Sequence, residues 1–212
     1  MFSLIHGQQS SEICMHYRFN SDSAVVYRAI YDKSFTNSPQ INFASEKDSI
    51  KISYGYKLIN HHTEDPLKAN YFTDLAEFKT DKYGNKPVKK DSLNFVEKLF
   101  NVNIFLPEYS NKCVKTGETW TTQNDLHSLL YKKITKKYQF TEYNKSEAKI
   151  NYNAEYYKDD ENKPERVIKG VYIIDSGSGL VKEADLNVYH PAEDYRYQMT
   201  IERISKPEAG SK

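Results

Sequence analysis

Hydrophobic side chains occupy every second position in several stretches of this sequence. In residues 50–58, 148–156 and 195–201, Ile, Tyr, Leu, Ala or Met alternates with polar residues or Gly, and shorter runs are Met15, Tyr17, Phe19 and Tyr138, Phe140. A period of two places one set of side chains on a single face of a strand. Half-buried strands of this kind are typical of antiparallel sheets with one solvated face.

The second half of the chain predicts a meander of consecutive antiparallel strands. Short polar or Gly-containing segments separate the alternating runs, and such segments form hairpin loops. The expected strands are 136–143, 147–157, 166–174, 180–189 and 195–204. The fold class is therefore mainly β, a curved antiparallel sheet or an incomplete barrel.

Two segments predict short helices beside this sheet. Residues 91–100 begin with Asp91 and Ser92 as candidate N-caps and carry apolar residues on one stripe. Asp65 and Pro66 start a second candidate, in which Leu67, Tyr71 and Leu75 share one side. These helices would make the protein a β-rich α+β fold.

Composition indicates a folded chain rather than a disordered one. Hydrophobic residues make up only 38%, but aromatic residues reach 14%, with 18 Tyr and 10 Phe, and disordered chains contain few aromatics. We expect a single β-rich domain over residues 11–205, a possible signal-peptide remnant or disordered start at 1–10, and a disordered tail at 206–212. The net charge of +1 provides no field that would attract nucleic acid.

The start of the chain leaves its location open. MFSLIHGQQS contains a short apolar run followed by Gly7, which resembles the end of a truncated signal peptide. An ordinary cytoplasmic start is the alternative. No stretch approaches the roughly 18 apolar residues of a transmembrane helix. Cys14 and Cys113 would form a disulfide if the protein is exported, and are otherwise unpaired and buried.

No motif in the sequence predicts a catalytic, cofactor or metal site. His61 and His62 are adjacent, so on a strand they would point to opposite faces. The loop at 175–179 lacks the ligands of a calcium site and the lysine of a P-loop. His127 follows Asp125 in a polar segment, and the acidic pairs at 159–160 and 193–194 lie in expected loops. We therefore assign no catalytic residue, cofactor or metal ligand.

The only tryptophan lies in a hydrophilic stretch. Pro107 ends any preceding element, Gly117 and Glu118 lie in an expected turn, and Trp120 begins a new strand. Trp120 would then seal one end of the core, with its N–H donating to a nearby carbonyl. The alternative is that Trp120 faces a ligand.

Three strings resemble a family of uncharacterised exported β-rich proteins of Bacteroidetes-type bacteria. They are LPEYSNKCVKTGETWTT with its LP…VxxG[DE]xW pattern, MHYRFNSDSAVVYRA, and KGVYIIDSGSGLVKEADLNV. The resemblance implies a curved sheet similar to that of lipoprotein carriers, and export to the periplasm, the cell surface or the medium. It carries over no catalytic residues. Cys14 lacks the small residues of a lipobox before it, so the sequence does not establish a lipid anchor.

These observations lead to three functional hypotheses. In the first, a non-enzymatic exported protein binds a lipid, glycan or peptide on the concave face of the sheet. In the second, the core is filled and the protein is a structural module or interacts with another cell-envelope protein. The third is a hydrolase with a site dispersed over loops. An apolar cavity of about 300 Å³ or more would favour the first.

The cysteine pair gives a direct test of export. If the protein is exported and its first strand lies beside the Trp120 turn, Cys14 and Cys113 would be bonded, and the full chain, kept without reductant, should show a mass lower by two hydrogens than the reduced chain. Peptide mapping should recover the two cysteines in one cross-linked fragment. Two free thiols under oxidising conditions would contradict this prediction.

Overall fold

The computed structural model describes residues 12–18, 23–32, 35–45, 49–60, 71–85, 104–125, 131–158, 163–204 and 208–209. These residues form antiparallel β structure and contain no α-helix. The predicted β-rich class is therefore confirmed. No helix in the described part of the chain is long and apolar enough to cross a membrane.

One large open sheet dominates the structure. In spatial order its strands are β5 (Tyr71–Thr80), β4 (Ile50–Asn60), β3 (Phe35–Ser45), β2 (Ser23–Tyr31), β12 (Tyr195–Arg203), β11 (Val181–His190), β10 (Arg166–Asp175), β9 (Glu147–Tyr157), β8 (Lys133–Asn144) and β7 (Thr119–Asp125). Each neighbouring pair is antiparallel. The edges are β5 and β7, which remain unpaired with each other, so the sheet does not close into a barrel.

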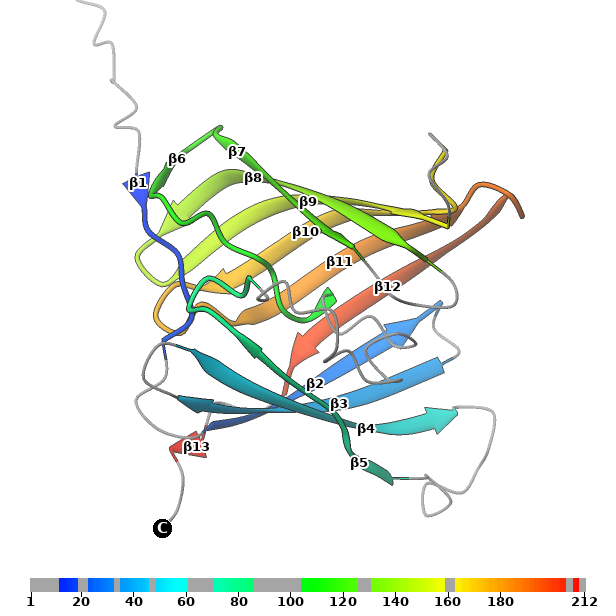
Figure 1. Cartoon of the computed structure of the whole chain (residues 1–212), viewed down its shortest axis with the longest axis horizontal. Coiled ribbons are helices and arrows are strands. Elements are labelled where there is room, and N and C mark those ends of the chain that lie inside the picture. Colours follow the sequence, from blue (N-terminus) through cyan, green and yellow to red (C-terminus); the bar gives the residue numbers. More distant parts are fainter. Residues whose placement is uncertain are drawn as a thin grey trace, which may run out of the picture.

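The sheet consists of two meanders joined by one long-range pairing. Strands β7 to β12 follow one another in sequence and in space, which confirms the predicted meander, and β2 to β5 form the second. β12 pairs with β2 over Met199↔Tyr31 to Arg203↔Tyr27. Figure 1 shows the resulting curved sheet, with β7–β11 and β3–β5 on opposite sides of the segment that precedes β6.

The alternation in the sequence sets which face is buried. In β9 the buried residues are Ala148, Ile150, Tyr152, Ala154 and Tyr156, and their neighbours are exposed or half-buried. The same alternation continues in β8 and β11. The buried positions of the paired strands lie side by side, so the concave face forms the core.

A second, small sheet crosses one end of the large one. β1 (Glu12–Ile13) pairs with β6 (Val114–Lys115). The alternation at Met15 and Tyr17 predicts a longer strand, but residues 14–18 form none. Both side chains are buried, and Tyr17 N donates to Lys82 O at 2.8 Å. The backbone bonds of this segment go to separate turns rather than to one ladder, which corrects the prediction.

Two further predictions are corrected. Residues 71–75, placed in the helix that starts at Asp65, belong to β5, where pairing with β4 satisfies the backbone and Tyr, Phe and Thr favour strands. The helix at 91–100 lies outside the described residues. In the tail predicted as disordered, Glu208 and Ala209 form β13, which pairs with Ala24 and Ser23 at the start of β2.

Candidate functional site

Residues 104–109 pass through the interior of the curved sheet without forming a strand. All six are buried. A buried loop is uncommon, because each backbone N–H and C=O that leaves water needs a hydrogen-bond partner. This core segment has no ladder to supply those partners.

Buried tyrosines supply two of the missing donors. Tyr172 Oη donates to Ile104 O at 2.8 Å, and Tyr17 Oη donates to Pro107 O at 2.7 Å. Both tyrosine rings belong to the core. Each therefore packs as an apolar ring and satisfies a carbonyl with its tip. Pro107, predicted only to end an element, is part of this buried segment.

Trp120 donates a hydrogen bond to the carbonyl of the residue that follows Pro107 in the core segment. Its Nε1 donates to Glu108 O at 2.8 Å, and its ring stacks on Tyr138 with centroids 5.1 Å apart. Glu108 N in turn donates to Tyr138 Oη at 3.2 Å. Trp120 is half-buried and lies on the inward side of β7. The structure thus places Trp120 between the edge strand and the core segment.

An ion pair inside the core fixes the same segment to β8. Lys136 Nζ lies 2.6 Å from Glu108 Oε1, and the two side chains are 0% and 2% exposed. Glu108 Oε2 is buried and has no hydrogen-bond partner among the described residues. Removing one partner of a buried pair leaves an uncompensated charge. This lowers the free energy of unfolding far more than the loss of a surface pair does.

The tyrosines around this pair remain neutral. Burial raises the pKa of Tyr138 well above its usual value, and the nearby Glu108 carboxylate raises it further. Burial raises the pKa of four more core tyrosines in the same way; they are Tyr17, Tyr109, Tyr152 and Tyr172. The hydroxyl groups of Tyr17 and Tyr172 therefore keep the protons that they donate to the core segment.

Gly117 and Glu118 form an exposed turn and do not reach the core. Gly117 has a φ of 90°, which favours glycine, and a Cβ there would meet nothing within 4 Å. Glu118 Oε2 accepts a hydrogen bond from Lys115 N at 2.8 Å. Gly117 N donates to Phe140 O at 2.7 Å. The turn directs the chain from β6 into β7.

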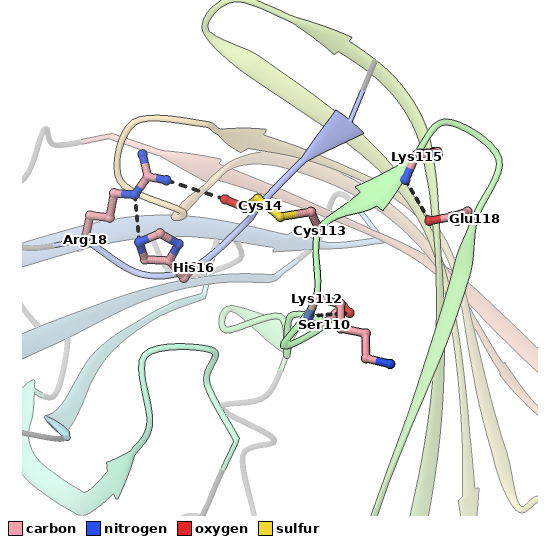
Figure 2. The surroundings of a disulfide bond; sticks show 8 residues. All are labelled: Cys14, His16, Arg18, Ser110, Lys112, Cys113, Lys115 and Glu118. Atoms are coloured by element: carbon pink, nitrogen blue, oxygen red, sulfur yellow. Dashed lines mark hydrogen bonds between the residues drawn. A yellow bond between two sulfur atoms is a disulfide. The ribbon is translucent and has the colours of Figure 1, made fainter. Parts of the chain in front are cut away.

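The disulfide lies beside this turn. Cys14 and Cys113 are bonded, with Cα atoms 4.1 Å apart and a sequence separation of 99. Figure 2 shows the bond with the Arg18–His16 contact on one side and the Lys115–Glu118 contact on the other. The pKa of His16 is lowered by partial burial and then by the charge of Arg18. The disulfide ties the N-terminal segment to the start of β6.

A half-exposed aromatic group lines the other end of the concave face. We call it the tyrosine rim; it comprises Tyr31, Tyr131, His190, Tyr195 and Tyr197. Tyr197 lies at its centre, with ring centroids 6.4 Å from Tyr31, 6.1 Å from His190 and 5.7 Å from Tyr195. Tyr195 is 48% exposed. Unlike the centre of the concave face, the rim is accessible to solvent.

Arg166 projects into the tyrosine rim from the first position of β10. Its Nη2 donates to Tyr197 Oη at 2.9 Å, and its guanidinium carbon lies 5.6 Å from the ring centroid of Tyr156. Its Nε is buried without a partner among the described residues. The pKa of His190 is lowered by burial first and by the positive charge of Arg166 second.

The strand alternation contains a signal for these charged residues. Lys136 is in phase with the buried Ile134 and Tyr138, so an inward lysine could have been read from the sequence. Arg166 is likewise in phase with the buried Ile168. Glu108 had no such signal, because the core segment does not alternate.

The structure brings together none of the other sequence candidates that it describes. His61, His62, His127 and the pair at 159–160 lie outside the described residues. Glu193 and Asp194 lie in the turn between β11 and β12, and residues 175–179 form the turn between β10 and β11. Within the described ranges, no three His, Cys, Asp or Glu residues are grouped so as to hold a metal ion.

Comparison with known proteins adds no family. No protein-family model matches the chain, and no curated protein matches it. Among solved structures, an N-terminal dehydratase from the difficidin assembly line shares 10% sequence identity, over 87% of this chain and 78% of that chain, with a TM-score of 0.17. A similarity at that score carries no argument about fold or function.

The buried ion pair can be tested by a double-mutant cycle. We expect Lys136→Met to lower the free energy of unfolding by about 3–5 kcal/mol, because it leaves the Glu108 carboxylate buried without a cation. Adding Glu108→Gln should recover much of that loss, since the buried charge is removed. Urea denaturation measures all variants.

Lys182→Met is the matched control, because the side chains of Lys182 and its partner Glu147 are 45% and 31% exposed, so this pair is partly solvated. We expect that variant to unfold almost as the native protein does. If the double variant loses as much free energy of unfolding as the Lys136→Met and Glu108→Gln variants lose together, the two residues are not energetically coupled and the prediction is wrong.

Proposed function

We propose that this chain is a non-enzymatic binding protein of the cell envelope, and that it takes its ligand at the tyrosine rim. The observation that carries the proposal is the contrast between the two parts of the concave face. Core side chains such as Tyr138, Phe140 and Ile150 are fully buried, whereas the rim residues, on β2, β11, β12 and just before β8, are partly exposed on the same face of the sheet. Aromatic side chains held in this way provide contact area for a lipid, a glycan or a peptide.

Export is proposed on separate grounds. Disulfides persist in oxidising compartments such as the periplasm and the cell exterior. The Cys14–Cys113 bond links segments 99 residues apart, so it closes a long loop and would contribute to stability there. A protein exposed to the envelope benefits from such a link.

A second candidate is a structural or interaction module with a filled core. The core segment favours it, because residues 104–109 occupy the middle of the concave face where a carrier would hold its ligand. In this case the rim would contact another envelope protein. The two candidates differ in whether a small molecule binds.

Native mass spectrometry of the gently purified full chain separates the candidates. We expect an added mass on the 24.8 kDa chain that is lost on denaturation. Tyr197→Ala should reduce the bound fraction, because it removes the central ring of the rim.

Tyr143→Ala is the control, since Tyr143 is 36% exposed and lies near the distant end of β8. Native mass spectra without any added mass would argue against a bound ligand. If fatty acids, oligosaccharides and short peptides also cause no chemical-shift change, the structural module is favoured instead.

A further inference from the structure

In the described part of the chain, Lys136, Arg203 and Arg166 point to the concave face, and they differ in what neutralises their charge. Lys136 has the Glu108 carboxylate at 2.6 Å. Arg203 has the Asp175 carboxylate at 2.9 Å. Arg166 forms no ion pair with any residue that the structure describes; its partners are the Tyr197 hydroxyl, the Tyr131 hydroxyl and the Tyr156 ring.

A half-buried guanidinium without a carboxylate is an unusual arrangement. Taking a cation out of water costs several kcal/mol unless an anion or full hydrogen bonding compensates it. The hydroxyl groups of Tyr197 and Tyr131 are neutral acceptors, and a ring face contributes only a modest cation–π attraction. The buried Nε–H remains without an acceptor, so the compensation is incomplete.

Arg166 lies beside the tyrosine rim, whose residues are partly exposed to solvent. Tyr131, Tyr197 and His190 are half-buried, and Tyr195 is 48% exposed. His190 has a lowered pKa because of burial and Arg166, so at neutral pH it adds no second positive charge and can act as a hydrogen-bonding group. The nearby acidic residues are Glu165, which precedes Arg166, and Glu193 in the β11–β12 turn.

We infer that Arg166 is the anchor for an anionic group, a carboxylate or a phosphate, of a ligand whose body contacts the tyrosine rim. This inference rests on the proposed binding function. Nε–H and the remaining guanidinium N–H groups would donate to two oxygens of the anion, the geometry in which arginine binds carboxylates and phosphates most tightly. The rings of Tyr131 and Tyr197 would contact the uncharged body.

Paired probes test the charge requirement. The full chain is titrated by calorimetry with octanoate and octanamide, with glucuronate and glucose, and with inorganic phosphate. At least one anion should bind about ten- to hundredfold more tightly than its neutral counterpart, since hydrogen bonds to charged groups are the stronger ones. A preference for octanoate over octanamide would indicate a lipid ligand, and a preference for glucuronate over glucose would indicate a sugar acid. Binding of inorganic phosphate alone would indicate a free anion.

Two variants locate the effect. Arg166→Gln should abolish the preference for the anion while leaving binding of the neutral counterpart. Arg196→Gln is the matched control, because Arg196 on β12 is exposed and stacks over Tyr189, and it should keep the preference. Thermal unfolding of each variant checks that the fold is retained.

The results separate this inference from the proposed function. If neutral and anionic probes bind equally and both shift the resonances of β10 to β12 near the rim, the binding function stands and the anion anchor is wrong. If Arg166→Gln keeps the preference, the anchor is also wrong. If no probe perturbs the rim, both proposals fail.

Discussion

The structure depends on how a buried loop obtains its hydrogen bonds. Residues 104–109 fill the concavity of an open sheet, where neither water nor a strand partner can satisfy their backbone. Aromatic side chains do so instead, with Tyr172, Tyr17 and Trp120 each donating to one carbonyl of the segment. Leaving one such group unpaired would cost about 1–3 kcal/mol. This requirement gives a physical reason for tyrosine, rather than phenylalanine, at these core positions.

The remaining interactions hold the core segment in register with the sheet edges. The Glu108–Lys136 pair joins it to β8, and Tyr109 N donates to Tyr83 O in the turn that follows β5. That turn packs closely, since a Cβ on Gly84 would lie 2.9 Å from Tyr17 and 3.0 Å from Pro107 O. The two open edges of the sheet are thus connected through the segment between them. The same packing leaves the tyrosine rim as the accessible part of the concave face.

The strands could be predicted from the sequence because their signal is local. Alternation in 148–156 and 195–201 indicates both the strand and its buried face. The β12–β2 pairing has no such signal, because the partners are far apart in the chain. The core segment is harder still: Tyr172 and Ile104 are 68 residues apart, and Tyr17 and Pro107 are 90 apart. A tyrosine in the sequence does not reveal which distant carbonyl its hydroxyl will reach.

The most direct test of this account compares two tyrosines whose rings touch. Tyr172 and Tyr152 are both buried, with ring centroids 5.0 Å apart, but only Tyr172 donates to the core segment, and Tyr152 Oη has no partner among the described residues. In urea denaturation, Tyr172→Phe should lower the free energy of unfolding by about 1–3 kcal/mol. Tyr152→Phe should be neutral or stabilising, because it removes an unpaired buried hydroxyl. Equal losses from both variants, or no loss from Tyr172→Phe, would contradict the account.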